Sequence, residues 1–176
     1  MIVRSVLHIN GQTKAQNLYA ALQETFDHLL LKLAASLFYF DLQPSIESGA
    51  THAALQGQEY WPDVMSTDEA GQVRLWVECG KTTLHKLAKV SKRYRDARIV
   101  VLTAEPHQAR QQAEGIIAEG LSGIEVWSFA EGEFDRWRRL AGEKNEIIGE
   151  ATPTSLNLVL NDEAYVTDLQ RHSTAA

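Results

Sequence analysis

Residues 59–98 read EYWPDVMSTDEAGQVRLWVECGKTTLHKLAKVSKRYRDAR, and this stretch decides the expected fold. β-Branched and aromatic residues on either side of STDEAGQ predict two strands, Tyr60–Met65 and Val73–Cys79, joined as a hairpin. Thr82 or Thr83 can cap the helix that follows. One side of that helix is apolar and the other is rich in lysine and arginine.

The register of the hairpin decides whether Asp63 and Glu78 meet. A two-residue turn at Ala70-Gly71 places the two carboxylates directly opposite each other on one face of the sheet. A turn at Glu69-Ala70 leaves Asp63 facing Trp76 and diagonal to Glu78. A three-residue loop would put the two carboxylates on opposite faces.

The segments before this stretch predict a strand and then a very apolar helix. Residues 2–9 form the strand, which stops at the turn signal Asn10-Gly11. The helix starts at about Ala15 or Gln23 and runs to Phe40, with apolar residues nearly all round, so we expect it to be covered on every side. A short strand, SIES, and a loop follow it.

The C-terminal half alternates strands and helices. The apolar run RIVVLT predicts a central strand, a helix follows at about His107–Glu119, and IEVWSF and EGEFDRWRRLAG predict another strand and helix. A final β-hairpin turns at Asn161-Asp162. This order predicts one α/β domain with a mixed sheet, residues 1–170, and a disordered tail at 171–176. No glycine-rich turn joins a strand to a helix, which excludes a Rossmann-type nucleotide site.

Composition limits the classes of protein that need consideration. A chain of 176 residues with 44 % hydrophobic and 23 % charged residues is the size of one globular domain. Cys79 is the single cysteine, so an intrachain disulfide is impossible. The sequence shows no secretory signal and no apolar run of membrane-spanning length, so we expect a cytoplasmic protein without membrane contact.

Basic residues gather in one segment of this otherwise acidic chain. The net charge is −6, yet seven of the 17 lysines and arginines lie between Lys81 and Arg98, where Asp96 is the only acid. Phosphate contacts come from such clusters, so nucleic acid is the partner that this segment suits. The alternative is a solvated helix face without a partner.

Two further features have more than one reading. Glu24 lies near the start of the apolar helix on the side of Leu31, so its carboxylate either points inward or stabilises the positive helix N-terminus. The four tryptophans are expected in the core or half-buried in the sheet rather than as base-stacking platforms. They are Trp61, Trp76, Trp127 and Trp137.

Four stretches together resemble the YaeQ family, within the PD-(D/E)XK nuclease-like superfamily. They are ETFDHLLLKLAASLFYF (Glu24–Phe40), Pro62-Asp63, LWVECG (Leu75–Gly80), and VWSF with the C-terminal hairpin. The resemblance covers most of the chain after about Gln23. It implies a restriction-endonuclease-like αβββαβ core with an extra C-terminal β-hairpin.

The resemblance also implies an activity and a role for each acid. Asp63 matches the metal-binding aspartate of the motif, Glu78 the second acid, and Glu24 the carboxylate on the first helix. Such oxygen ligands suit Mg²⁺ or Mn²⁺, which would orient a water and stabilise charge on a phosphodiester during hydrolysis.

The motif's lysine is missing from its usual place, which here is Gly80. Lys81 is one residue late, and a bulge at Cys79-Gly80 would be needed to redirect it. Alternatively, Lys86 or Lys89 of the basic helix supplies the ammonium. Because glycine stands at the motif's lysine position, two further interpretations remain open. One is a catalytically inactive nuclease-like fold that binds nucleic acid or protein, and the other is a pair of surface acids that form ordinary salt bridges.

Overall fold

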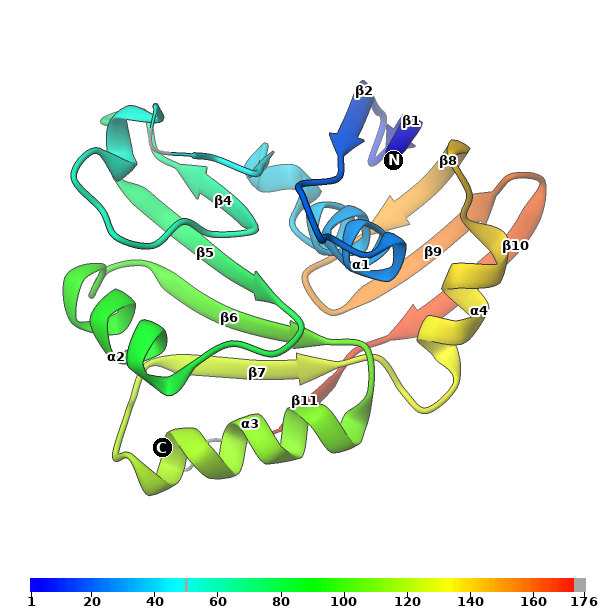
Figure 1. Cartoon of the computed structure of the whole chain (residues 1–176). Coiled ribbons are helices and arrows are strands. Elements are labelled where there is room, and N and C mark those ends of the chain that lie inside the picture. The colour runs from blue at the N-terminus through cyan, green and yellow to red at the C-terminus, as the bar shows by residue number, and fades with distance from the viewer. Residues whose placement is uncertain (50, 173–176) are drawn as a thin grey trace.

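Two mixed β-sheets enclose one helix, α1 (Phe26–Phe38), in this computed structural model, which describes residues 1–49 and 51–172 (Figure 1). The five-stranded sheet has the order β10-β9-β8-β1-β2 and consists of β1 (Ile2–Ile9), β2 (Gln12–Tyr19), β8 (Lys144–Ala151), β9 (Ser155–Leu160) and β10 (Glu163–Asp168). The six-stranded sheet has the order β11-β7-β6-β5-β4-β3 and consists of β3 (Ser45–Ile46), β4 (Val64–Thr67), β5 (Val73–Cys79), β6 (Arg98–Thr103), β7 (Ile124–Ser128) and β11 (Gln170–His172).

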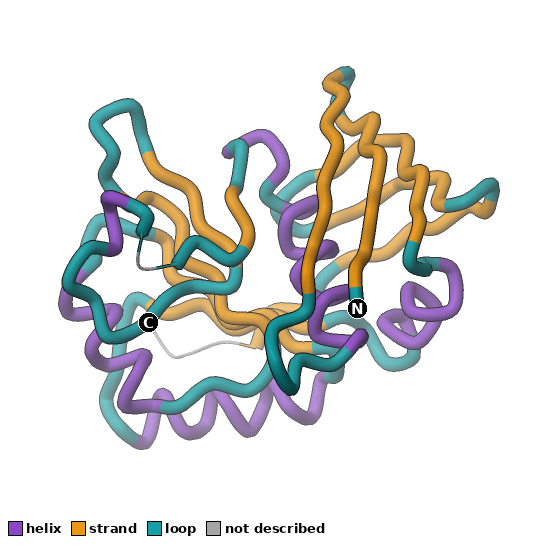
Figure 2. Tube along the Cα trace, turned by 45° about the horizontal axis from the view of Figure 1, so that its top comes forward, coloured by secondary structure: helices purple, strands orange, loops and turns teal. Residues whose placement is uncertain are grey.

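Helix α1 is apolar nearly all round because both sheets pack against it. Leu29, Leu30, Leu33 and Leu37 are completely buried in the core between the sheets. The side-chain oxygen of Thr25 accepts a hydrogen bond from the backbone N–H of His28 and so caps the helix start. The expectation of a helix covered on every side is confirmed, and the tube in Figure 2 shows α1 beside the strands of the five-stranded sheet.

The other helices complete the layers. The connections of the parallel strands β5, β6 and β7 run through α2 (Leu84–Arg93) and α3 (Pro106–Ala118), on the face of the six-stranded sheet away from α1. A second core, which includes Trp76 and Val101, lies under these two helices. Helix α4 (Glu133–Leu140) packs near β10, where its Trp137 contacts Tyr165.

The expected start of α1 at Ala15 is wrong. Residues Gln12–Tyr19 form strand β2, which pairs antiparallel with β1. Asn10 and Gly11 both have positive φ, 51° and 75°, the two-residue turn that folds a chain back on itself as a hairpin. The Asn10-Gly11 turn signal therefore marks a hairpin, and the strand that returns from it replaces the expected helix start.

The C-terminal part also differs from the prediction. The hairpin β9–β10 does turn at Asn161 and Asp162, but it is no appendage, because β9 pairs with the unpredicted β8, which pairs with β1. Arg171 and His172, expected in a disordered tail, belong to β11. The rest of that tail, residues 173–176, lies outside the described part of the chain. The fold is mixed α/β, with the hairpin built into the five-stranded sheet.

The β4–β5 register results from two irregularities that cancel. Thr67 pairs with Val73 and Asp68 bonds to Gln72, which leaves a three-residue loop, the type expected to separate Asp63 from Glu78. However, Ser66 pairs with Leu75, so Arg74 is an extra residue and forms a bulge. The bulge restores the register of the pair Val64–Val77. Asp63 nevertheless precedes β4, and its side chain turns to Lys32 of α1, whereas Glu78 contacts Lys86 of α2, so the two carboxylates do not share a face as expected.

We predict that Gly149→Ala strongly destabilises the five-stranded sheet. Gly149 has φ +149°, and a Cβ there would overlap the carbonyl oxygen of Asn157 on the neighbouring strand. Urea unfolding should show a loss of about 3 kcal/mol or more. Gly142→Ala is the control, because the nearest atom to its added Cβ is 4.0 Å away, and it should change stability by less than about 0.5 kcal/mol. Equal effects of the two substitutions would contradict the prediction.

Candidate functional site

A buried lysine of α1 lies among three carboxylates at the ends of β4 and β5. Lys32 Nζ is 2.6 Å from Glu24 Oε1, 3.2 Å from Glu47 Oε1 and 3.3 Å from Asp63 Oδ1. His28 bridges two of them, with Nδ1 3.0 Å from Glu24 and Nε2 3.4 Å from Asp63. We call these five residues the Lys32 cluster.

Local structure brings the cluster together. Glu24, His28 and Lys32 are spaced four residues apart, so they follow one side of α1 and its approach. Asp63 is fixed from the sheet, because its Oδ2 accepts a 2.7 Å hydrogen bond from the Cys79 backbone N–H. Glu47, with positive φ, donates its backbone N–H to the Asp63 carbonyl. The cluster therefore depends on both α1 and the β4–β5 hairpin.

Burial and charge act in opposite directions on the cluster. Burial alone would lower the pKa of Lys32, but the hydrogen bond to Glu24 and the charges of Asp63, Glu24 and Glu47 outweigh it, so the pKa is raised. Burial alone would raise the pKa of Asp63. Bonds from His28 and the Cys79 N–H, with the charges of His28 and Lys32, outweigh that effect and hold the pKa below its usual value.

Glu78 lies on the other side of β5 and is also buried. Its Oε1 accepts a 2.6 Å bond from Trp76 Nε1, and its Oε2 is 2.7 Å from Lys86 Nζ of α2. Burial raises the pKa of Glu78, and the negative charge of Asp63 contributes to the rise, although Lys86 and Trp76 oppose it. The two candidate acids are therefore electrostatic neighbours, but they bond to different helices.

The structure separates the three candidate lysines. Gly80 has φ +82°, which turns the chain out of β5, so Lys81 is exposed instead of lying along the strand. Lys89 pairs with the exposed Glu59. Of the three, only Lys86 contacts a candidate carboxylate.

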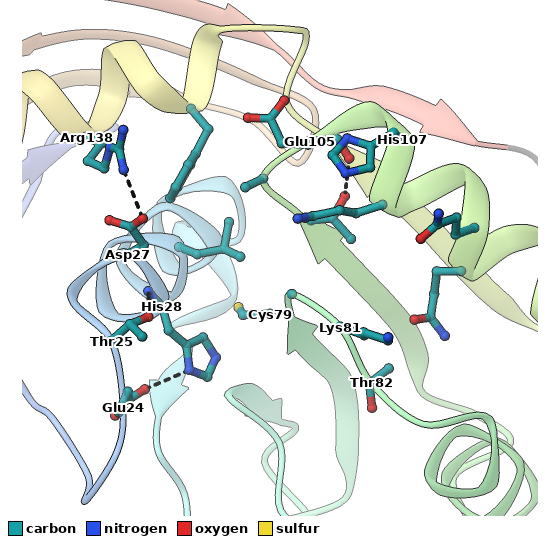
Figure 3. A pocket seen from close by; sticks show the side chains of 18 of the residues that line it. Glu24, Thr25, Asp27, His28, Cys79, Lys81, Thr82, Glu105, His107 and Arg138 are labelled. Carbon is teal, nitrogen blue, oxygen red and sulfur yellow. Dashed lines mark hydrogen bonds and ion pairs between the residues drawn. The ribbon is translucent and has the colours of Figure 1, made fainter.

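A cleft of about 990 Å³ adjoins the Lys32 cluster (Figure 3). It opens at the carboxyl ends of β5 and β6, the edge where α/β proteins commonly bind ligands. Glu24, His28 and Cys79 line one side, and Lys81 and His107 line the other. Of the predicted site residues, Glu24 and Lys81 line the cleft, whereas Asp63, Glu78, Lys86 and Lys89 do not.

Sequence reasoning missed His28, Lys32 and Glu47. The four-residue spacing of Glu24, His28 and Lys32 was a usable signal, because a charged line on an otherwise apolar helix needs a polar partner. Glu47 gave no such signal. Of the tryptophans, Trp76 and Trp137 are buried and Trp127 is half-buried, as expected, but Trp61 is 48 % exposed, which corrects the expectation that it is a core or sheet residue.

The donor set meets part of what a metal ion requires. The carboxylate oxygens are of the type that Mg²⁺ and Mn²⁺ prefer. Around β5, the four carboxylates of Glu24, Glu47, Asp63 and Glu78 lie among the ammonium groups of Lys32 and Lys86 and the imidazole of His28. However, no group of three His, Cys, Asp or Glu side chains within residues 1–49 and 51–172 is arranged to hold a metal ion. The donor atoms and their charge fit a divalent cation, but the ammonium group of Lys32 lies between the carboxylate oxygens of Glu24, Glu47 and Asp63.

Comparison with known proteins identifies the family. The sequence model of the YaeQ protein matches residues 23–168. The chain belongs to the YaeQ family. No curated protein matches the sequence. None of the helices in the described part of the chain is long and apolar enough to cross a membrane.

Two solved YaeQ structures share the fold over nearly the whole chain. The YaeQ protein from Xanthomonas axonopodis pv. citri has a TM-score of 0.73 at 15 % identity, and covers 99 % of this chain and 98 % of its own. The YaeQ protein from Pseudomonas syringae has a TM-score of 0.74 at 13 % identity, and covers 98 % and 95 %. At such low identity, the likeness shows the fold alone.

We predict that Lys32→Met lowers the free energy of unfolding by about 3–5 kcal/mol, because three carboxylates lose their buried counter-charge. Lys89→Met is the matched control. Lys89 also lies 2.6 Å from a glutamate, but both side chains are at least half exposed, so the loss should stay below about 1 kcal/mol. Guanidinium unfolding of both variants measures the difference. Similar losses would show that the Lys32 cluster adds nothing beyond a surface pair.

The Asp63 carboxylate should make stability depend on pH. Its folded-state pKa is lowered, so its contribution is present above the unfolded value of 3.8 and is lost as the pH falls through the folded value. The stability difference between the wild type and Asp63→Asn, from urea unfolding, should therefore shrink on acidification. A difference that grows toward low pH would contradict this assignment.

Proposed function

We propose that this YaeQ family member is a divalent-metal-dependent nuclease that hydrolyses phosphodiester bonds at the end of β5. The observation that carries the proposal is the convergence of Glu24 and Asp63, with Glu78 as an electrostatic neighbour, in a region where four carboxylates face two lysine ammonium groups and His28. These three carboxylates would hold Mg²⁺ or Mn²⁺. The bound ion would supply Lewis-acid stabilisation of the phosphate and an activated water.

Lys86 is the lysine that fits the remaining role. Its Nζ contacts Glu78 Oε2 at 2.7 Å and the Trp61 carbonyl at 3.0 Å, so it reaches from α2 across the end of β5. An ammonium in this position can bind a phosphate oxygen beside the acid, in place of the lysine absent at Gly80. Lys81 is suited to a different contact, because it is exposed along the adjoining cleft.

A second function is favoured by the position of Lys32. Its ammonium lies between Glu24, Glu47 and Asp63, where a cation would have to bind. A chain that keeps this lysine in place permanently would be a catalytically inactive nuclease-like fold that acts as a binding module. The two functions differ in whether Mn²⁺ can compete with Lys32 for the carboxylates.

Calorimetric titration with Mn²⁺ separates the two functions. We expect binding at about millimolar dissociation constants or tighter, weakened about tenfold or more by Asp63→Asn and by Glu78→Gln. Glu59→Gln is the matched control, because Glu59 also pairs with a lysine of α2 but is exposed and lies outside the site, and it should bind Mn²⁺ like the wild type. Absence of Mn²⁺ binding in folded wild-type protein would reject the nuclease and leave the binding module.

Cleavage assays test the role of Lys86. Lys86→Met should still bind Mn²⁺ but lose about 100-fold or more in cleavage of oligonucleotides, because the developing phosphate charge loses its ammonium. Lys144→Met should cleave like the wild type, since Lys144 is an exposed lysine on β8 of the other sheet. Equal losses in the two lysine variants would reject the specific role of Lys86.

A further inference from the structure

The solvent side of α2 carries a line of basic residues. His85, Lys89 and Lys92 are exposed and spaced four and three residues apart, so they share one face of the helix. Arg93 and Arg95 are exposed at its C-terminal end. On a chain with a net charge of −6, this concentration of basic residues offers contacts to phosphates, with Glu59 as the acid already paired to Lys89.

Two aromatic residues lie at the N-terminal end of this line. The Tyr60 ring is 5.7 Å from Lys89 Nζ and meets the His85 ring edge-on at 6.4 Å. Trp61 is 48 % exposed, and its carbonyl accepts a hydrogen bond from Lys86. A half-exposed tryptophan forgoes the stabilisation that burial of its apolar surface would give. Trp61 lies two residues before Asp63 in the sequence.

Cations alone would make an ordinary solvated helix face. Proteins that bind single-stranded nucleic acid combine a cationic track for the phosphates with an aromatic ring on which a base stacks. Both parts occur here, and Lys86 connects them to the proposed site, because its Nζ bonds to both the Trp61 carbonyl and Glu78. A duplex hides the faces of its bases within the stack, so it could not use the tryptophan.

We propose that Trp61 and the face of α2 formed by Lys89 and Lys92 bind single-stranded nucleic acid, with one base stacked on the indole and the adjoining phosphates on the lysines. This inference rests on the proposed function, for which it names the substrate class. The strand would pass from α2 over Trp61 toward Lys86 and Glu78. The binding itself requires no metal ion.

The first experiment measures the anisotropy of a labelled oligo-dT and of a hairpin duplex with the full chain, in EDTA at about 50 mM salt. The single strand should bind more tightly, and Trp61→Ala should weaken its binding by about tenfold, since one base stack is lost. Trp61→Phe should recover most of the affinity. Tyr19→Ala is the control, because Tyr19 is also exposed (62 %) but lies on β2 of the other sheet.

The second experiment tests the cationic track through salt dependence. Lys92→Ala should reduce the slope of log affinity against log salt by about 0.7, the contribution of one phosphate contact on a single strand. Lys144→Ala removes an exposed lysine of β8 and should leave the slope unchanged. A slope unaffected by Lys92→Ala would remove the track from the proposal.

The remaining outcomes are decisive. Undetectable binding of the single strand, equal or tighter binding of the duplex, or an unchanged affinity in Trp61→Ala would overturn the inference. Because the assay contains no metal, its result is separate from that of the Mn²⁺ titration. Strand binding without Mn²⁺ binding would support the surface and reject the nuclease. Mn²⁺ binding without strand binding would reject the surface and support the nuclease.

Discussion

The ion pairs of Lys32 constrain the arrangement of this molecule, because a buried ammonium is tolerated only where opposite charge surrounds it. Helix α1 is enclosed by two sheets, and the side chain of its single lysine is only 7 % exposed. The chain meets this requirement by bringing in Glu24 from the residue before the helix cap, Glu47 from the loop after β3, and Asp63 from the residue before β4. Three distant segments are thereby fixed at one end of the sheet.

The same interaction explains how the site can hold excess negative charge in the folded state. Three carboxylates near one ammonium would repel one another, but each is within 3.3 Å of Lys32, and Asp63 has a further bond from the sheet backbone. The negative charge of Glu78 is compensated separately, by the ammonium group of Lys86. In a catalytically inactive fold the lysines would remain as permanent counter-ions. In a metal-dependent nuclease they would give way to a metal ion. The stability of the metal-free fold is compatible with both.

Much of the architecture could be predicted from local pattern. The strand β6, the capped helix α2 and the Asn161–Asp162 turn follow from an apolar run, a threonine before an amphipathic segment, and residues that tolerate positive φ. Prediction failed where pairing over long distance decided the structure. Strand β2 is polar and half-exposed, and β8 has a weak alternation, so each is a strand because β1 lies between them.

The sequence by itself determined the candidate acids, the cationic character of α2 and the family, because these depend on residue type and order along the chain. Only the tertiary structure decided which groups meet. Asp63 meets Lys32 of α1 while Glu78 meets Lys86 of α2 on the other side of β5, and the left-handed turn at Gly80 removed Lys81 from the strand and left Lys86 as the nearby ammonium. The physical reason is that a one-residue shift in register reverses the face of every side chain in a strand, and such shifts are set by contacts that no local pattern records.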